Sequence, residues 1–159
     1  MRKFFTLLGL VAAIVAFAQT SVTIEDQKMV VMRDGQSYVL TPNGEDASYF
    51  WASVSPDEQH LVYVTARYGT FVCDINGQNV QSMGRMNAPK WIDNRHVAGM
   101  QEFYTGHDEI DHIRYIARSI DGRDTRDLST VEKQVFVEAE NVRLAAEKKR
   151  QAARLAARH

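Results

Sequence analysis

The stretch VSPDEQHLVYVTARYGTFVCDINGQNVQSM, residues 54–83, contains two runs, HLVYVTA and TFVCDI, separated by polar turns. Several positions in these runs alternate apolar with polar side chains, as half-buried antiparallel strands do. The second run ends at Asn76-Gly77, a pair that favours a tight hairpin because Gly and Asn tolerate the positive φ that the turn requires. The stretch therefore predicts a small antiparallel β-meander.

The same pattern recurs along the chain. Three turn glycines, Gly35, Gly77 and Gly122, each follow Asp or Asn and lie 42 and 45 residues apart. A second landmark, an apolar run that begins with His after a polar turn, starts at His60 and again at His96. A period of roughly 40 to 45 residues built from short strands is typical of β-propeller blades.

These repeats resemble the TolB-type β-propeller repeat, in which a W-S-P-D-G turn precedes short apolar strands and a D-x-D-G turn closes the unit. A second copy at residues 88–130 keeps Trp91, but its S-P-D-G turn is degraded, and residues 28–44 resemble the outer strands of a preceding blade. The resemblance covers residues 28–130. It indicates the fold rather than the function, since proteins with this repeat have many different functions. The matching residues of the first copy are Ser55, Pro56, Asp57, Leu61, Tyr63, Arg67, Gly69, Asp74, Asn76 and Gly77.

The predicted fold class is mainly β. We expect antiparallel meander blades of a partial β-propeller, with roughly eight short strands between residues 28 and 130, followed by a long C-terminal helix from about 131 to 155. Propellers have four to eight blades, whereas this chain supplies only about two and a half. Three arrangements remain open: several chains form a ring, the chain is a truncated relative, or the helix caps a short curved sheet.

The N-terminal residues predict export. Arg2 and Lys3 precede an apolar run from Phe4 to Phe17, and an A-x-A pattern ends at Ala18. This is the pattern of a secretory signal peptide, and the run is short of the roughly 20 residues that span a bilayer. We expect cleavage near Ala18/Gln19 and a periplasmic or secreted chain that has no later transmembrane segment. The expected division is a signal peptide at 1–18, TolB-like repeats at 19–130 and a charged Ala-rich helical tail at 131–159.

Charge and cysteine content exclude further classes of function and structure. Residues 19–130 hold 10 basic and 16 acidic side chains, a net charge of −6, so there is no basic stripe for a nucleic acid. The tail holds 7 basic and 4 acidic residues, a net charge of +3. A single cysteine, Cys73, excludes an internal disulfide framework, and its strand-like surroundings favour a buried thiol.

The stretch YTGHDEIDHIRY, residues 104–115, is the strongest candidate site. The second repeat is longer than the first between its two central strands, and this stretch predicts an enlarged hairpin loop. Three interpretations remain open, namely a protein-contact loop, a divalent metal site and a solvated loop, and His112 is expected on the solvent face of the next strand. The candidate contact residues are His107, Asp108, Glu109, Asp111 and His112.

Enzymatic motifs are absent from the sequence. TolB-type propellers also precede the catalytic domain of prolyl-oligopeptidase-like hydrolases, but the nearest string to the nucleophile elbow G-x-S-x-G, at residues 35–39, lacks the final Gly. There is no P-loop, dinucleotide fingerprint or H-E-x-x-H motif. We expect no enzyme activity and no cofactor. The alternatives are a remnant of such a hydrolase, or a metal-binding module that uses the 104–112 loop.

The C-terminal segment predicts one long helix. It lacks Gly and Pro, is rich in strong helix formers, and offers Ser129 or Thr130 as the N-cap. Its thin apolar stripe suits either a solvated helix or weak docking, and its basic end allows weak contact with an anionic surface. Together these features predict an exported, non-enzymatic module that binds envelope proteins or itself. The stripe consists of Val131, Val135, Val142, Ala145, Ala146 and Ala153.

Overall fold

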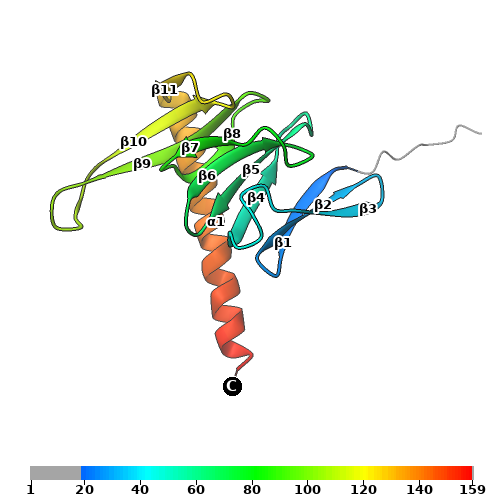
Figure 1. The fold of residues 1–159 in the computed structure, drawn as a ribbon. Helices are drawn as coiled ribbons and strands as arrows, with labels where there is room; N and C mark the ends of the chain where they lie inside the picture. Colours follow the sequence, from blue (N-terminus) through cyan, green and yellow to red (C-terminus); the bar gives the residue numbers. More distant parts are fainter. Residues whose placement is uncertain (1–18, 159) are drawn as a thin grey trace, which may run out of the picture.

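The computed structural model describes residues 19–158, and the predicted signal peptide lies outside them. It contains three antiparallel sheets followed by one long helix (Figure 1).

The first sheet consists of β1 (Ser21–Glu25), β2 (Lys28–Arg33) and β3 (Gln36–Leu40). The second consists of β4 (Tyr49–Val54), β5 (His60–Thr65), β6 (Gly69–Asp74) and β7 (Gln81–Gly84). The third consists of β8 (Asn87–Trp91), β9 (His96–Tyr104), β10 (Ile110–Ser119) and β11 (Thr125–Asp127), and α1 (Thr130–Ala156) follows. The predicted fold class, mainly β with a C-terminal helix, is confirmed.

The second sheet is buried between the other two. Leu61 and Tyr63 of β5 are fully buried and pack in one cluster with Met29 of the first sheet. Val62, which lies between them on β5, packs in a second cluster with Ile116 of the third sheet. Because successive side chains on a strand point to opposite faces, this central strand contributes to two hydrophobic cores. The three sheets therefore form a stack in chain order.

The repeated landmarks of the sequence occupy equivalent places in the three sheets. Gly35, Gly77 and Gly122 lie in the turns before β3, β7 and β11, with φ of 74°, 81° and 73°. These φ values lie in the left-handed region that favours glycine. His60 and His96 are the first residues of β5 and β9. A turn at each of the three glycines is thus confirmed, but only the connection at Gly35 is a tight hairpin, and the internal repeat stays a prediction.

The number of strands differs from the prediction. Residues 28–130 contain ten strands rather than roughly eight, and β1 lies before them, outside the range of the resemblance. β11 has only three residues, all exposed, and it pairs with β10 from Ile116↔Asp127 to Arg118↔Thr125. Such a strand exists because a neighbouring strand offers it hydrogen bonds. Local apolar periodicity gives no sign of it.

The helix α1 docks on the outer face of the third sheet. Phe136 is only 4% exposed, and its ring meets that of Tyr115 edge to face with centroids 5.8 Å apart. Lys90 Nζ lies 5.3 Å from the centre of the Phe136 ring and 2.7 Å from Glu140 Oε2. Lys90 lies directly opposite Ala98, and Ala98 lies directly opposite a second buried alanine, so this sheet face has little side-chain bulk beneath the helix. The helix therefore caps the stack at this end.

The apolar stripe proposed for the helix does not make this contact. Val131, Val135 and Val142 are 71%, 61% and 71% exposed, so the stripe faces solvent, and the contact predicted for it with a partner or a second copy stays a prediction. The inward face instead holds Phe136 and Glu140, because the sheet presents Lys90 as an ionic partner for the carboxylate. A stripe found by counting apolar residues cannot reveal a docking face that is partly ionic.

The first turn of α1 is held by a capping box and an ion pair. The Ser129 hydroxyl accepts from the Glu132 backbone N–H, and the Glu132 carboxylate accepts from the Ser129 backbone N–H. Arg126 donates to both Glu132 carboxylate oxygens at 2.7 Å. The Arg126 guanidinium and the cap lower the pKa of Glu132 from its ordinary 4.5 to about 2. A charged Glu132 therefore favours the folded state.

We expect acid to remove this stabilisation. Because the folded-state pKa is depressed, the contribution of Glu132 is fully present above about pH 4.5 and is lost as the pH falls toward about 2. Thermal unfolding followed by circular dichroism across this range should show a shallower acid dependence for Glu132→Gln than for the unaltered protein. Glu138→Gln is the control, since Glu138 accepts only from Gln134 within the helix. Equal acid slopes for Glu132→Gln and the unaltered protein would contradict the assignment.

Cys73 belongs to the core between the first two sheets. Its side chain is completely buried beside Tyr63, and burial raises the pKa of its thiol to about 12, with Asp74 adding to the shift. The thiolate is the reactive form of cysteine, so burial disfavours the reactive form of Cys73 in the folded chain. The predicted burial of this thiol is confirmed.

Candidate interaction surfaces

The stretch singled out in the sequence forms the outer part of a long hairpin. We call residues 101–114, at the joined ends of β9 and β10, the acidic arm. Every residue from 103 to 114 is exposed, and Figure 1 shows this hairpin extending beyond the rest of the third sheet. The expected enlarged loop is wrong in one respect. The extra residues lengthen the two strands, and only residues 105–109 form the connection.

The five predicted contact residues lie along this arm. His107, Asp108 and Glu109 are in the connection, whereas Asp111 and His112 belong to β10. His112 is on the surface as expected, and its Nδ1 lies 2.8 Å from Asp111 Oδ2. Its ring stacks on Phe103 with centroids 4.5 Å apart. The arm therefore presents these side chains together on one projecting element.

The arm does not assemble a metal site in the structure. Within residues 19–158, no three His, Cys, Asp or Glu side chains converge in a way that could hold a metal ion. The connection is instead closed by backbone hydrogen bonds, from Thr105 N to Glu109 O at 3.0 Å and from His107 N to Thr105 O at 2.6 Å. Asp108 has a positive φ of 61° at this tip.

One face of the arm combines apolar side chains with a carboxylate. Glu102 lies directly opposite Ile113, and Tyr104 lies directly opposite Ile110. Side chains that face each other across a pair, or that are two residues apart, share one side of a ribbon. Tyr104 and Ile110 are 55% and 49% exposed, and the Tyr104 hydroxyl donates to Glu102. This face therefore presents about half-exposed apolar side chains beside a carboxylate.

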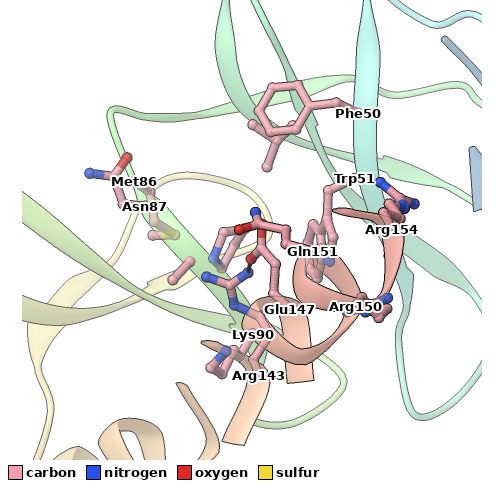
Figure 2. Close-up of a pocket in the computed structure, with 13 residues that line it drawn as sticks. Phe50, Trp51, Met86, Asn87, Lys90, Arg143, Glu147, Arg150, Gln151 and Arg154 are labelled. Carbon is pink, nitrogen blue, oxygen red and sulfur yellow. Dashed lines mark hydrogen bonds and ion pairs between the residues drawn. The ribbon is translucent and has the colours of Figure 1, made fainter. Parts of the chain in front are cut away.

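A groove lies between the C-terminal half of α1 and the first strands of the second and third sheets. We call it the cationic groove, and its volume is about 490 Å³. Figure 2 shows Gln151, Arg150 and Arg154 of the helix around Trp51, with Phe50 at one end. Val64 and Met86 complete an apolar floor. The remaining lining residues are Asn87, Ala88, Pro89, Lys90, Arg143 and Glu147.

Irregular strands shape this groove. The register between β4 and β5 shifts at Phe50, which leaves its ring 59% exposed. The register between β8 and β9 shifts between Asn87 and Lys90, where Ala88 has a positive φ of 51°. Bulges redirect side chains and end regular pairing, and they occur often beside functional sites. Here they present an aromatic ring and a backbone bend to the same hollow.

The charges in the groove are unevenly paired. Glu140 accepts from Lys90 at 2.7 Å and from Arg143 at 2.6 Å, and Arg143 also donates to Glu147 at 3.0 Å. The Arg143 guanidinium, assisted by Lys90, holds the pKa of the Glu140 carboxyl below its usual range. By contrast, Arg150 and Arg154 form no ion pair within residues 19–158. The groove therefore offers two guanidinium groups without a carboxylate partner, although Arg150 Nε donates to Ala146 O at 3.4 Å, beside the exposed Phe50 ring and the half-buried Trp51 ring.

This groove was not predictable from local sequence patterns. The late basic residues of the helix are visible in the sequence, but Phe50 and Trp51 lie about 100 positions earlier in the chain. No local pattern connects a strand near residue 50 with a helix near residue 150. The tertiary structure brings them together.

The opposite end of the stack is open. The outer face of the first sheet, which we call the open face, carries Met32 and Val39, which are 38% and 62% exposed. Val30 lies directly opposite Val39 and is nearly covered, at 8%. This sheet has three strands, whereas the other two have four. Within the described chain, α1 covers only the far end of the stack.

No helix within residues 19–158 is both long and apolar enough to cross a membrane. Comparisons with known protein families, with curated proteins and with solved structures found no match for this chain.

Proposed function

We propose that the protein is an exported, non-enzymatic protein-interaction module whose open face binds another protein. The partner at this face is an envelope protein, and the compartment is the periplasm or the exterior. The resemblance of residues 28–130 to TolB-type blades and the secretory pattern of residues 1–18 support this proposal.

The observation that carries the proposal is the difference between the two ends of the stack. Each inner sheet face is covered by a neighbouring sheet, and α1 covers the outer face of the third sheet. Among the outer sheet faces that the structure describes, the open face keeps the exposed Met32 and Val39 side chains without cover from another element. Sheet faces of this kind bury apolar area when a matching surface packs on them, which is favourable at about 25 cal/mol per Å².

The test is an affinity pull-down from the native envelope with the exported protein. We expect a defined envelope protein to co-purify with the unaltered protein and to be lost with Met32→Lys/Val39→Lys. Lysine at these positions places charge in the contact while remaining soluble at an exposed site.

The matched control is Val80→Lys/Ile92→Lys. Val80 and Ile92 are 41% and 36% exposed and do not belong to the open face. This variant should retain the partner. If Met32→Lys/Val39→Lys recovered the same partner, or if the unaltered protein bound no partner at any concentration, the open face would not be the binding surface.

A further inference from the structure

We propose that the cationic groove binds the acidic arm of a second copy of this chain, so that copies join arm to groove. This inference uses a surface different from the open face and stands independently of it.

Charge complementarity supports the pairing. The arm carries Asp108 and Glu109 at its tip, with Asp111 and Glu102 on its strands, and all four are carboxylates. The groove offers Arg150 and Arg154, whose guanidinium groups can each bind a carboxylate through two parallel hydrogen bonds. The acidic body of one copy therefore supplies the arm, and the basic tail of the other copy supplies the groove.

The apolar parts of the two surfaces also match. The arm brings Tyr104 and Ile110, which are exposed on one face, and the groove brings Phe50 and Trp51. Aromatic rings flanked by arginine are the side chains that dominate binding at protein interfaces. The arm is already ordered by its ladder and by the bonds that close its tip, so little conformational entropy is lost on binding.

The dimensions of the two surfaces are compatible. Arg143 to Arg154 spans roughly 16 Å along the helix at about 1.5 Å per residue. The four outer residues of β9 extend roughly 13 Å at about 3.3 Å per residue.

The arm that binds in the groove must come from another molecule. In Figure 1 the β9–β10 hairpin extends away from the C-terminal half of α1, and its strands continue the third sheet as a paired ribbon. The arm cannot fold back to its own groove without breaking that pairing. An arm-to-groove contact uses two different surfaces, so it joins copies head to tail and forms a ring or an open chain.

The experiment measures self-association of the exported protein by sedimentation velocity across a concentration series. We expect reversible oligomers in about 0.1 M salt that weaken at least about tenfold in about 1 M salt, where the Debye length falls from about 10 Å to about 3 Å. The arm variant Asp108→Lys/Glu109→Lys and the groove variant Arg150→Glu/Arg154→Glu should each be monomeric. The protein that combines all four substitutions should associate again, because the charges are exchanged between the two surfaces.

The control is Lys148→Glu/Lys149→Glu, which reverses two charges of the same helix outside the groove and should leave association unchanged. Circular dichroism checks that each variant keeps its fold, as expected for exposed side chains. Monomeric unaltered protein, or oligomers that survive both the arm and groove variants, would overturn the proposal. If an acidic protein of the envelope occupies the groove instead, the unaltered protein stays monomeric and only the groove variant loses that protein, which also overturns it.

Discussion

Replacing Phe136 by alanine should destabilise the protein by about 3 kcal/mol, a cost typical of removing a buried aromatic side chain. Phe136 is the one apolar side chain of α1 that is buried, and it contacts both the ring of Tyr115 and the ammonium group of Lys90. Without it, the buried Glu140 carboxylate and Lys90 lose the apolar cover beside their ion pair. Because the net stability of a domain is only about 5 to 15 kcal/mol, this is a large fraction.

Urea unfolding followed by circular dichroism measures the effect. Val135→Ala is the matched control, since Val135 precedes Phe136 on the same helix but is 61% exposed. That variant should change the free energy of unfolding by no more than about 0.5 kcal/mol. Equal midpoints for Phe136→Ala and Val135→Ala would show that the helix does not depend on this anchor.

Tyr63→Ala should be still more costly, by about 4 kcal/mol, because it opens a cavity at the centre of the stack. Tyr63 is fully buried, and its ring centre lies 5.7 Å from those of both Tyr49 and Phe71. Its hydroxyl donates to Asn43 Oδ1, in the segment that leads from the first sheet to the second. The side chain therefore packs against its neighbours in the second sheet, belongs to the core cluster shared with Met29 of the first sheet, and bonds to the connection between the two sheets.

Two variants separate the contributions of the ring and of the hydroxyl. Tyr63→Phe keeps the ring and leaves Asn43 Oδ1 without its donor, so a loss of about 1 kcal/mol is expected in the same urea experiment. Tyr38→Ala removes a tyrosine that is 46% exposed and should cost much less than Tyr63→Ala. If Tyr63→Phe were as damaging as Tyr63→Ala, the hydrogen bond rather than the packed ring would hold this core together.

Local features of the chain were predictable from sequence because their causes are local. The turns at Gly35, Gly77 and Gly122 require a left-handed backbone that Gly adopts without strain. The start of α1 follows from Ser129 and Glu132, which form a capping box three residues apart. The mainly β class, the C-terminal helix and the buried thiol follow from composition and alternation over short windows.

Features that depend on contacts between distant residues were not predictable. Gly99 shows no special pattern in the sequence, yet a Cβ at this position would lie 2.0 Å from Met86 Cγ. The docking face of α1 was missed because Lys90, fifty positions earlier, stabilises Glu140 there. The arm residues were identified correctly as exposed and acidic, but their placement on two lengthened strands depends on the ladder between β9 and β10.

The sequence alone determined the turns, the helix and its cap, and the exposed acidic stretch, because each depends on residues a few positions apart. Only the tertiary structure decided the order of the stacked sheets, which end the helix caps, and the meeting of Trp51 with Arg150 and Arg154 in one groove. The physical reason is that packing, ion pairing and the burial of apolar area act between surfaces. A surface exists only after segments that are far apart in the chain have come together.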